Sequence, residues 1–231
     1  TDNYINGAPA TDGLVTVFGG CDELLHVVSV EDGTKLGEIW AGAYIPGSAA
    51  LVDGRAFLGH YDNKLVCIDL EEQRIVWEYQ DSEYGGPFFG SPAVGQDRVV
   101  LGTRDEFRHC VDRQTGAPVW RFRTRHEIDG SPVIAGDKVV FGSIDGWLYV
   151  VSLEDGRRLW SYEIGAAILG CPAVTGGFVV IGAEDGRIYF FRLEPKQGTR
   201  PRTVKPAWVY TTEGAETPNG AVSSSPAVAD G

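Results

Sequence analysis

The sequence predicts an all-β fold, a β-propeller of four-stranded antiparallel blades, and three observations support this. A unit of about 40 residues recurs five times and begins a sixth time, and its first five opening residues are glycines spaced 40, 43, 40 and 40 residues apart. Each unit holds short β-branched and aromatic runs between Gly- and Asp-containing turns, and no stretch has a useful helical period. Four short strands in a unit of this length are typical of a propeller blade. The opening positions are Gly7, Gly47, Gly90, Gly130, Gly170 and Ser224.

The fourth unit shows how the strands are assigned. The dipeptide Gly136-Asp137 predicts a tight turn between the first and second strands, and Asp145-Gly146 predicts a hairpin between the second and third. The middle strands are nearly continuous apolar runs, which fits burial on both sides between neighbouring blades, and the fourth strand alternates polar and apolar residues at the rim. The predicted strands are residues 132–135, 138–142, 148–151 and 158–162.

The whole chain, residues 1–231, is predicted to be a single propeller array with five complete blades and a remnant at each end. We expect a fragment of a seven- or eight-bladed ring, which forms an open arc with two exposed sheet edges unless its ends meet. A basic, Pro-rich insertion at 194–206 and a polar stretch at 211–219 are candidate contact loops or spacers. The predicted blades are approximately residues 7–42, 47–80, 90–124, 130–164 and 170–212, with a partial sixth from 224.

A tryptophan closes every unit, and we expect it to dock the outer strand onto a turn of a neighbouring blade. Tryptophan suits this structural role because it has a large apolar body and one N–H group to satisfy. Trp147 is different, because it starts a third strand near the loop face, where it could stack on a ligand or pack between blades. The docking set is Trp40, Trp77, Trp120, Trp160 and Trp208.

An aspartate follows the second strand of every unit. Such residues could be metal ligands, but five copies in five blades cannot converge on one ion. Asp side chains favour turns because they accept hydrogen bonds from backbone N–H groups two residues on, so we interpret the set as turn formers. Its members are Asp22, Asp62, Asp105, Asp145 and Asp185.

Composition limits the possible partners. Arg121, Arg123 and Arg125 alternate along a fourth strand, where charges discourage edge-to-edge pairing. They could also form an anion or nucleic-acid patch, but the net charge of -12 argues against a nucleic-acid partner. No apolar run reaches the roughly 20 residues of a membrane helix, so direct membrane insertion is not expected.

The cysteines and histidines do not form a recognisable chemical site. Cys67 and Cys110 occupy third-strand packing positions, and none of the four cysteines has a C-x-x-C partner. His26 and His109 also occupy packing positions, and no two histidines have metal-site spacing. We therefore assign no catalytic, cofactor-binding or metal-binding residue.

If a binding site exists, it should lie where two kinds of connection share one face of the propeller. These are the turns between second and third strands and the connections from a fourth strand to the next blade. Aromatic and charged residues gather there, a composition suited to protein or small-ligand recognition. The candidate interaction rim is Tyr44, His60, Tyr61, Tyr84, Phe89, Arg104, Arg125, His126, Asp129 and Trp147.

The motif Ser-Pro-x-x-x-Gly-Asp-x-Val-Val-Phe-Gly-Ser-x-Asp-Gly-x-Leu-Tyr at 131–149, followed by Gly-x-x-x-Trp, resembles the pyrroloquinoline-quinone-type (PQQ-like) propeller repeat. The resemblance covers residues 7–210. One group of that family comprises quinoprotein alcohol and glucose dehydrogenases, which hold the quinone with Ca²⁺. Its alcohol-type members carry an adjacent cysteine pair, which is absent here, and no Glu, Asn and Asp set matches theirs. The other group consists of non-enzymatic scaffolds, of which BamB-like outer membrane assembly factors are the best known.

The regular repeats are closest in style to the BamB-like group. This resemblance implies a non-catalytic scaffold without a cofactor, which binds a protein partner through loops or sheet edges, with a periplasmic or cell-envelope location. One alternative is part of a PQQ-dependent dehydrogenase with Ca²⁺. Another is a sensor or accessory propeller of a larger kinase or ligase.

Overall fold

A computed structural model describes residues 4–83, 85–194, 204–213, 215 and 220–227 of the chain. All regular secondary structure in these residues is β-strand, which confirms the predicted all-β class. None of the described residues belongs to a helix long and apolar enough to cross a membrane. The chain divides into two compact units, residues 1–121 and 122–231, and each is described by itself.

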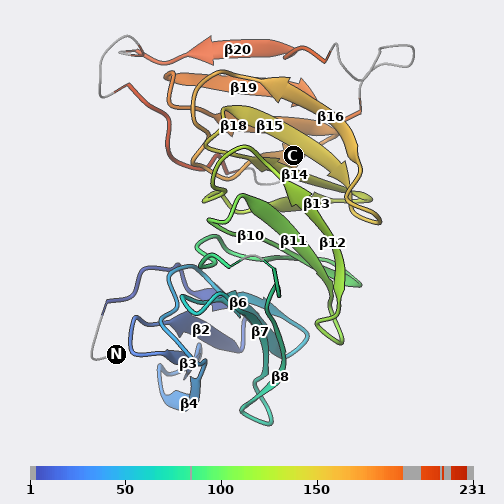
Figure 1. The fold of residues 1–231 in the computed structure, drawn as a ribbon. Helices are drawn as coiled ribbons and strands as arrows, with labels where there is room; N and C mark the ends of the chain where they lie inside the picture. Colours follow the sequence, from blue (N-terminus) through green and yellow to red (C-terminus); the bar gives the residue numbers. More distant parts are fainter. Residues whose placement is uncertain (1–3, 84, 195–203, 214, 216–219, 228–231) are drawn as a thin grey trace. The chain divides into compact units, whose positions relative to one another are not determined.

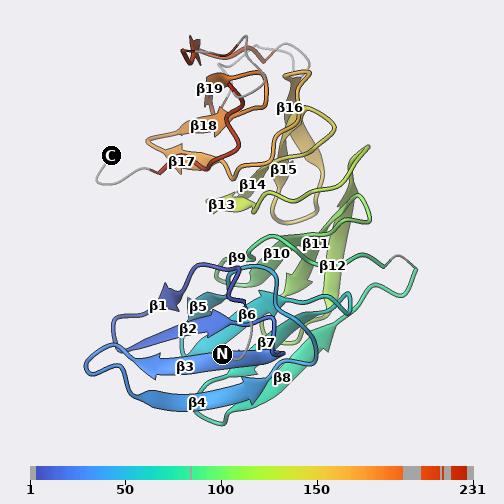
Figure 2. The same ribbon diagram turned by 90° about the vertical axis from the view of Figure 1, so that its left-hand side faces the viewer.

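The first unit contains three four-stranded sheets, and in each the strands are adjacent in the order of the sequence. Figure 2 shows the first of them, in which β1 to β4 run side by side. The first sheet consists of β1 (Ala10–Thr11), β2 (Val15–Gly19), β3 (Leu24–Ser29) and β4 (Lys35–Trp40). The second consists of β5 (Ala50–Val52), β6 (Arg55–Gly59), β7 (Leu65–Asp69) and β8 (Arg74–Tyr79). The third consists of β9 (Ala93–Val94), β10 (Arg98–Gly102), β11 (Phe107–Asp112) and β12 (Pro118–Arg123), and the division between the units falls within β12.

The second unit contains two more sheets of the same kind, and β18, β19 and β20 of the fifth sheet are labelled in Figure 1. Neighbouring strands pair antiparallel in both units. The predicted blade of four antiparallel strands is therefore confirmed. The fourth sheet consists of β13 (Val133–Ala135), β14 (Lys138–Gly142), β15 (Trp147–Ser152) and β16 (Arg158–Glu163). The fifth consists of β17 (Ala173–Thr175), β18 (Phe178–Gly182), β19 (Arg187–Arg192) and β20 (Trp208–Thr211).

The hydrophobic core lies between successive sheets. Val17, Leu25 and Ile39 of the first sheet pack with Leu58 and Val66 of the second. In the same way, the second sheet packs on the third in the first unit, and the fourth packs on the fifth in the second unit. Each fully buried side chain of this kind contributes roughly 1.5–3 kcal/mol. The middle strands are thus buried on both faces, as their continuous apolar sequences predict.

The opening glycines allow the start of each unit to approach the next very closely. A Cβ atom on Gly7 would lie 2.4 Å from the carbonyl oxygen of Gly47, and one on Gly47 would lie 2.5 Å from that of Phe89. In the second unit, a Cβ on Gly130 would lie 2.8 Å from the oxygen of Gly170. No side chain fits at these distances, which explains why glycine marks the repeat.

Two of the closing tryptophans dock onto the following sheet. The Trp77 Nε1–H donates to the Arg113 carbonyl at 3.1 Å, and the Trp160 Nε1–H donates to the Leu193 carbonyl at 2.9 Å. Both acceptors directly follow a third strand. Trp120 is partly buried in β12.

Trp40 does not occupy this position, which corrects the sequence-based assignment. In the second sheet Cys67 of the third strand pairs with Trp77 of the fourth strand. Val27 holds the position of Cys67 in the first sheet, but it pairs with Gly37 and not with a tryptophan. Trp40 lies three residues further on, is 61% exposed, and donates to Glu23 Oε2 within its own sheet. The space beside Gly37 is taken by the Gln73 side chain of the second sheet, which would lie 2.9 Å from an added Cβ.

Trp208 has the expected register but not the expected docking. It pairs with Phe190 and stacks on that ring at 4.6 Å, within its own sheet, and it is 48% exposed. Residues 195–203 of the insertion lie outside the described residues, as do 214 and 216–219 of the polar stretch. Residues 224–227, where a sixth blade was expected to begin, contain no strand, and the Cys171 N–H donates to Ser225 Oγ at 2.8 Å.

Candidate functional site

Four of the predicted rim residues form a contiguous surface on the first unit, which we call the aromatic cluster: Tyr44, Tyr61, Phe89 and Arg104. The rings of Tyr61 and Phe89 meet edge to face at 5.1 Å, and the guanidinium carbon of Arg104 lies 3.7 Å from the Phe89 ring centre. The Tyr61 N–H donates to the Tyr44 carbonyl at 3.0 Å. Tyr44 and Tyr61 are 48% and 44% exposed. The cluster therefore offers aromatic faces and a cation to solvent.

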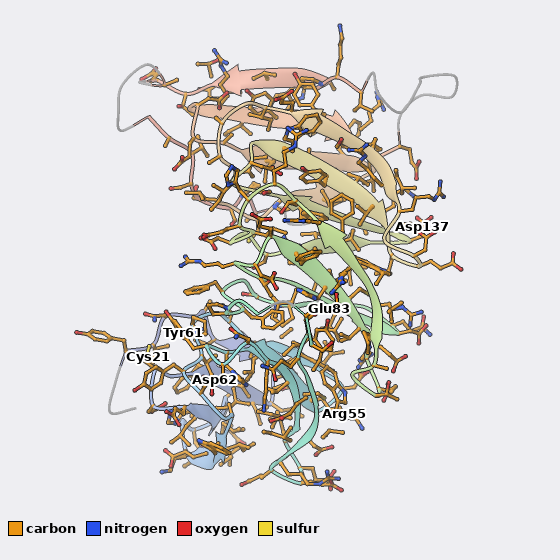
Figure 3. All side chains as sticks on the ribbon, viewed as in Figure 1. Cys21, Arg55, Tyr61, Asp62, Glu83 and Asp137 are labelled. Atoms are coloured by element: carbon orange, nitrogen blue, oxygen red, sulfur yellow. The ribbon has the colours of Figure 1, made fainter. Side chains whose placement is uncertain are left out.

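The repeat explains how these residues come together. Tyr44 and Phe89 lie in the connections that leave β4 and β8, and Tyr61 and Arg104 lie in the turns that follow β6 and β10. The Arg104 N–H donates to the Pro87 carbonyl at 3.4 Å, which joins a turn to a connection. Figure 3 shows Tyr61, Asp62 and Cys21 on one side of the first unit and Arg55, at the other end of β6, away from them. These two kinds of loop thus share a face in this unit.

His60 lies beneath this surface rather than on it, which corrects its assignment to the rim. Its side chain is 1% exposed, and its Nδ1 accepts the Asp62 N–H at 3.2 Å. Burial lowers the pKa of His60, because the charged imidazolium loses water. His60 thus holds the turn that presents Tyr61.

The second unit carries a smaller group of rim residues. Arg125 lies over the Trp147 ring at 5.9 Å, and its N–H donates to Asp145 Oδ2 at 3.1 Å. His126 is exposed and its carbonyl accepts the Thr124 hydroxyl at 2.6 Å. Asp129 is partly buried. Tyr84, the remaining rim residue, lies outside the described residues.

The repeated aspartates bind their own turns. Asp145 Oδ1 accepts the Trp147 N–H at 3.0 Å, and its Oδ2 accepts the Tyr149 hydroxyl at 2.7 Å. Asp22 uses the same two positions, accepting the Leu24 N–H and contacting His26 Nε2. In the second sheet the position of Tyr149 is held by Val66, which offers no hydrogen bond, and the aspartate there is exposed. Among the described residues, no group of three or more His, Cys, Asp or Glu side chains could hold a metal ion.

Asp81, Glu83 and Arg121 form a charged group at the edge of the third sheet, and their contact was not predicted from the sequence. Arg121 Nη1 lies 3.2 and 3.0 Å from the two oxygens of Asp81, and its Nη2 lies 2.5 Å from Glu83 Oε2. The hydrogen bonds to Glu83 and Asp81 raise the pKa of Arg121 above its usual value. Beneath them, the Tyr79 hydroxyl lies 3.0 Å from Nδ1 of the buried His109. The sequence does indicate a longer loop here, because Gly47 and Gly90 are 43 residues apart and the other opening glycines are 40 residues apart.

The exposed rings and the guanidinium of the aromatic cluster are the kind of groups found at protein interfaces. Exposed tyrosine and arginine side chains contribute strongly to protein interfaces because they combine large contact areas with hydrogen bonding. His26, His60 and His109 contact residues of turns and of the sheet packing. Cys67 and Cys110 are buried free thiols, as their strand positions indicate.

Comparison with known proteins gives concordant results. The family model described as "Outer membrane protein assembly factor BamB" matches residues 22–109 and 108–231. A curated protein of that name from Xanthomonas campestris pv. campestris is 25% identical over 121 residues, which are 46% of this chain and 30% of the relative. The match thus spans less than a third of that relative.

The fold is also similar to the crystal structure of BamB from Moraxella catarrhalis, with a TM-score of 0.57 and 16% identity. That alignment covers 91% of this chain and 78% of the other. It supports the propeller fold, and the family model supports the resemblance to PQQ-like repeats. Because the family model matches most of its length, the chain belongs to the PQQ-like repeat family described as outer membrane protein assembly factor BamB.

Proposed function

We propose that this chain is a non-catalytic β-propeller scaffold that binds a protein partner during outer membrane protein assembly, in the cell envelope. Its family and its curated relative carry the description of an assembly factor. The observation that supports a binding role for this chain is the aromatic cluster. The Tyr61 ring and the Arg104 guanidinium are exposed to solvent, on loops that connect strands with buried side chains.

The composition of the aromatic cluster suits a protein interface. Removing a central Tyr or Arg contact from an interface commonly costs about 2 kcal/mol, which is roughly thirtyfold in Kd. The backbone beneath is held by the bond from Tyr61 N–H to Tyr44 O and by buried His60. A rigid platform loses little conformational entropy when it binds, so its contacts are used efficiently.

Site-specific photo-crosslinking in cells that make the protein tests this proposal. A benzophenone amino acid at Tyr61 should give an adduct with a component of the outer membrane assembly machinery. The same group at Leu36, which is also exposed in the first unit, should not. Adding Arg104→Ala to the Tyr61 probe should reduce the adduct severalfold. Equal adducts at both positions, or none at Tyr61, would contradict a binding role for this surface.

A further inference from the structure

A separate pocket of about 300 Å³ lies at the edge of the first unit, between the segment that follows β8 and the outer strand β12. Residues 79–83 form one wall, and residues 118–121 form the other. The segment between β8 and β9 projects as a loop in Figure 2, and Figure 3 labels Glu83 in it. This volume is at the lower end of the range for ligand pockets and suits a single side chain or a small molecule.

The pocket arises where the chain departs from its own repeat. The connection that contains Asp81 and Glu83 is three residues longer than its counterparts, because Gly47 and Gly90 are 43 rather than 40 residues apart. Insertions in repeat proteins map to loops, and these loops often form the binding face. The residue at the position of Arg121 is Glu78 in the second sheet and Ser161 in the fourth. The acidic loop and its arginine thus form a combination that the second and fourth sheets lack.

The charge of the pocket is negative. Its lining includes two carboxylates and one guanidinium, which gives a formal net charge of −1, on a chain of net charge -12. Both oxygens of Asp81 contact Arg121, and Oδ1 also accepts the Glu83 N–H at 2.9 Å. Arg121 engages Oε2 of Glu83, so Oε1 of this 65% exposed side chain can accept a further donor. An incoming anion would have to break the existing pairs, whereas a cation would add to them.

The remaining walls suit an alkyl chain. Pro118 and Val119 are exposed on β12, and Tyr79 forms the floor. The Tyr79 ring is held in place by the contact of its hydroxyl with His109 Nδ1. Burial raises the pKa of Tyr79, and the nearby Asp81 carboxylate raises it further, so the floor stays uncharged at neutral pH. Long basic side chains place their alkyl stems on such surfaces and keep the charged end beside water.

We propose that this pocket receives an arginine or lysine side chain of a protein partner, with the alkyl stem on Val119 and the cation at Glu83. A peptide rather than a free amine is favoured because the pocket borders β12, the edge strand of its sheet. An edge strand offers backbone N–H and C=O groups to an extended partner segment. This second surface involves different side chains from the aromatic cluster, and its test does not depend on that cluster.

Titration of the ¹⁵N-labelled protein with the peptide acetyl-Ser-Val-Arg-Val-Ser-amide tests the proposal. The Trp120 indole resonance should shift saturably, while that of the buried Trp160 should not. The same peptide with citrulline, which keeps the shape of arginine without its charge, should bind less tightly. Glu83→Gln should weaken binding of the arginine peptide about two- to fivefold, the range expected for an exposed ion pair. Added salt should also weaken binding of the arginine peptide, because it screens the attraction between exposed charges.

Two controls make the result specific. Glu72→Gln removes another exposed carboxylate that is paired with an arginine, Arg74, and it should leave binding unchanged. Val119→Ser should weaken binding through the lost apolar wall, with an unaltered circular dichroism spectrum. The proposal is wrong if the citrulline peptide binds equally well, or if Glu83→Gln has no more effect than Glu72→Gln. Free agmatine binding as tightly as the peptide would also overturn the assignment to a protein partner.

Discussion

Replacing Trp160 with phenylalanine should lower the free energy of unfolding by about 1–3 kcal/mol. Trp160 is 3% exposed, and its Nε1–H donates a hydrogen bond to the Leu193 carbonyl at 2.9 Å. Phenylalanine keeps an aromatic ring near Phe191 but has no N–H group to donate to the buried Leu193 carbonyl. The folded state then loses free energy because this carbonyl is removed from water without a hydrogen bond in return. Because whole domains are stable by only about 5–15 kcal/mol, the change is readily measured.

Trp40→Phe provides the matched control. Trp40 is 61% exposed and its N–H donates to the partly buried Glu23 carboxylate, which keeps access to water, so its replacement should change the free energy of unfolding by less than about 0.5 kcal/mol. Trp77→Phe should resemble Trp160→Phe, because its N–H donates to the Arg113 carbonyl. Urea unfolding followed by far-ultraviolet circular dichroism measures all three without relying on tryptophan emission. If Trp40→Phe proved as costly as Trp160→Phe, the assignment of Gly37 rather than Trp40 to the docking position of the first sheet would be wrong.

Four further predictions concern the turns, the thiols, acid stability and the cofactor. Asp145→Ala should lower the free energy of unfolding by about 1–3 kcal/mol, because it removes acceptors for a hydroxyl and two amides, whereas Asp62→Ala should be nearly neutral; thermal melts will compare them. Burial raises the pKa of Cys67 to about 11 and that of Cys110 to about 12, so neither thiol should react with a disulfide reagent at pH 8 until urea unfolds the protein. The Thr115 hydroxyl and neighbouring amide donors lower the pKa of Asp112 in the folded protein. The ionised carboxylate therefore stabilises the fold above about pH 4, and this stabilisation is lost as the pH falls through the lowered pKa of the folded state. The Asp112→Asn variant should lose less stability in acid than the unchanged protein, as measured by the midpoints of urea unfolding. Absorbance titration with pyrroloquinoline quinone and Ca²⁺ should give no stoichiometric complex, and tight binding would instead favour the dehydrogenase alternative.

The repeat made the fold predictable because each of its markers has a local or nearest-neighbour cause. Gly47 recurs where two backbones meet, and Asp145 recurs where a turn needs an acceptor. The same regularity led to the error at Trp40. This residue stands 33 positions after its opening glycine, whereas Trp77 and Trp160 stand 30 after theirs. The spacing of 30 residues therefore predicts Gly37, and not Trp40, at the docking position of the first sheet.

The candidate sites were only partly predictable. Loops that leave the same ends of adjacent strands share a face, so Tyr44, Tyr61, Phe89 and Arg104 could be grouped from their positions in the repeat. Exposure could not be inferred in the same way, because His60 occupies a turn like Tyr61 and is nevertheless buried. The depth of a side chain depends on which neighbouring sheet covers it, and the pattern of one strand does not contain that information.

The strands, their order in each sheet and the faces that become buried are predictable from the sequence, because they follow from alternation, turn residues and spacing within about 40 residues. Contacts between distant groups follow only from the three-dimensional arrangement of the sheets. Arg121 is 40 and 38 residues from Asp81 and Glu83, and the three form one charged wall only because consecutive sheets bring an edge strand beside a loop. Side-chain contacts between sheets depend on packing distance and rotamer, which act in space rather than along the chain.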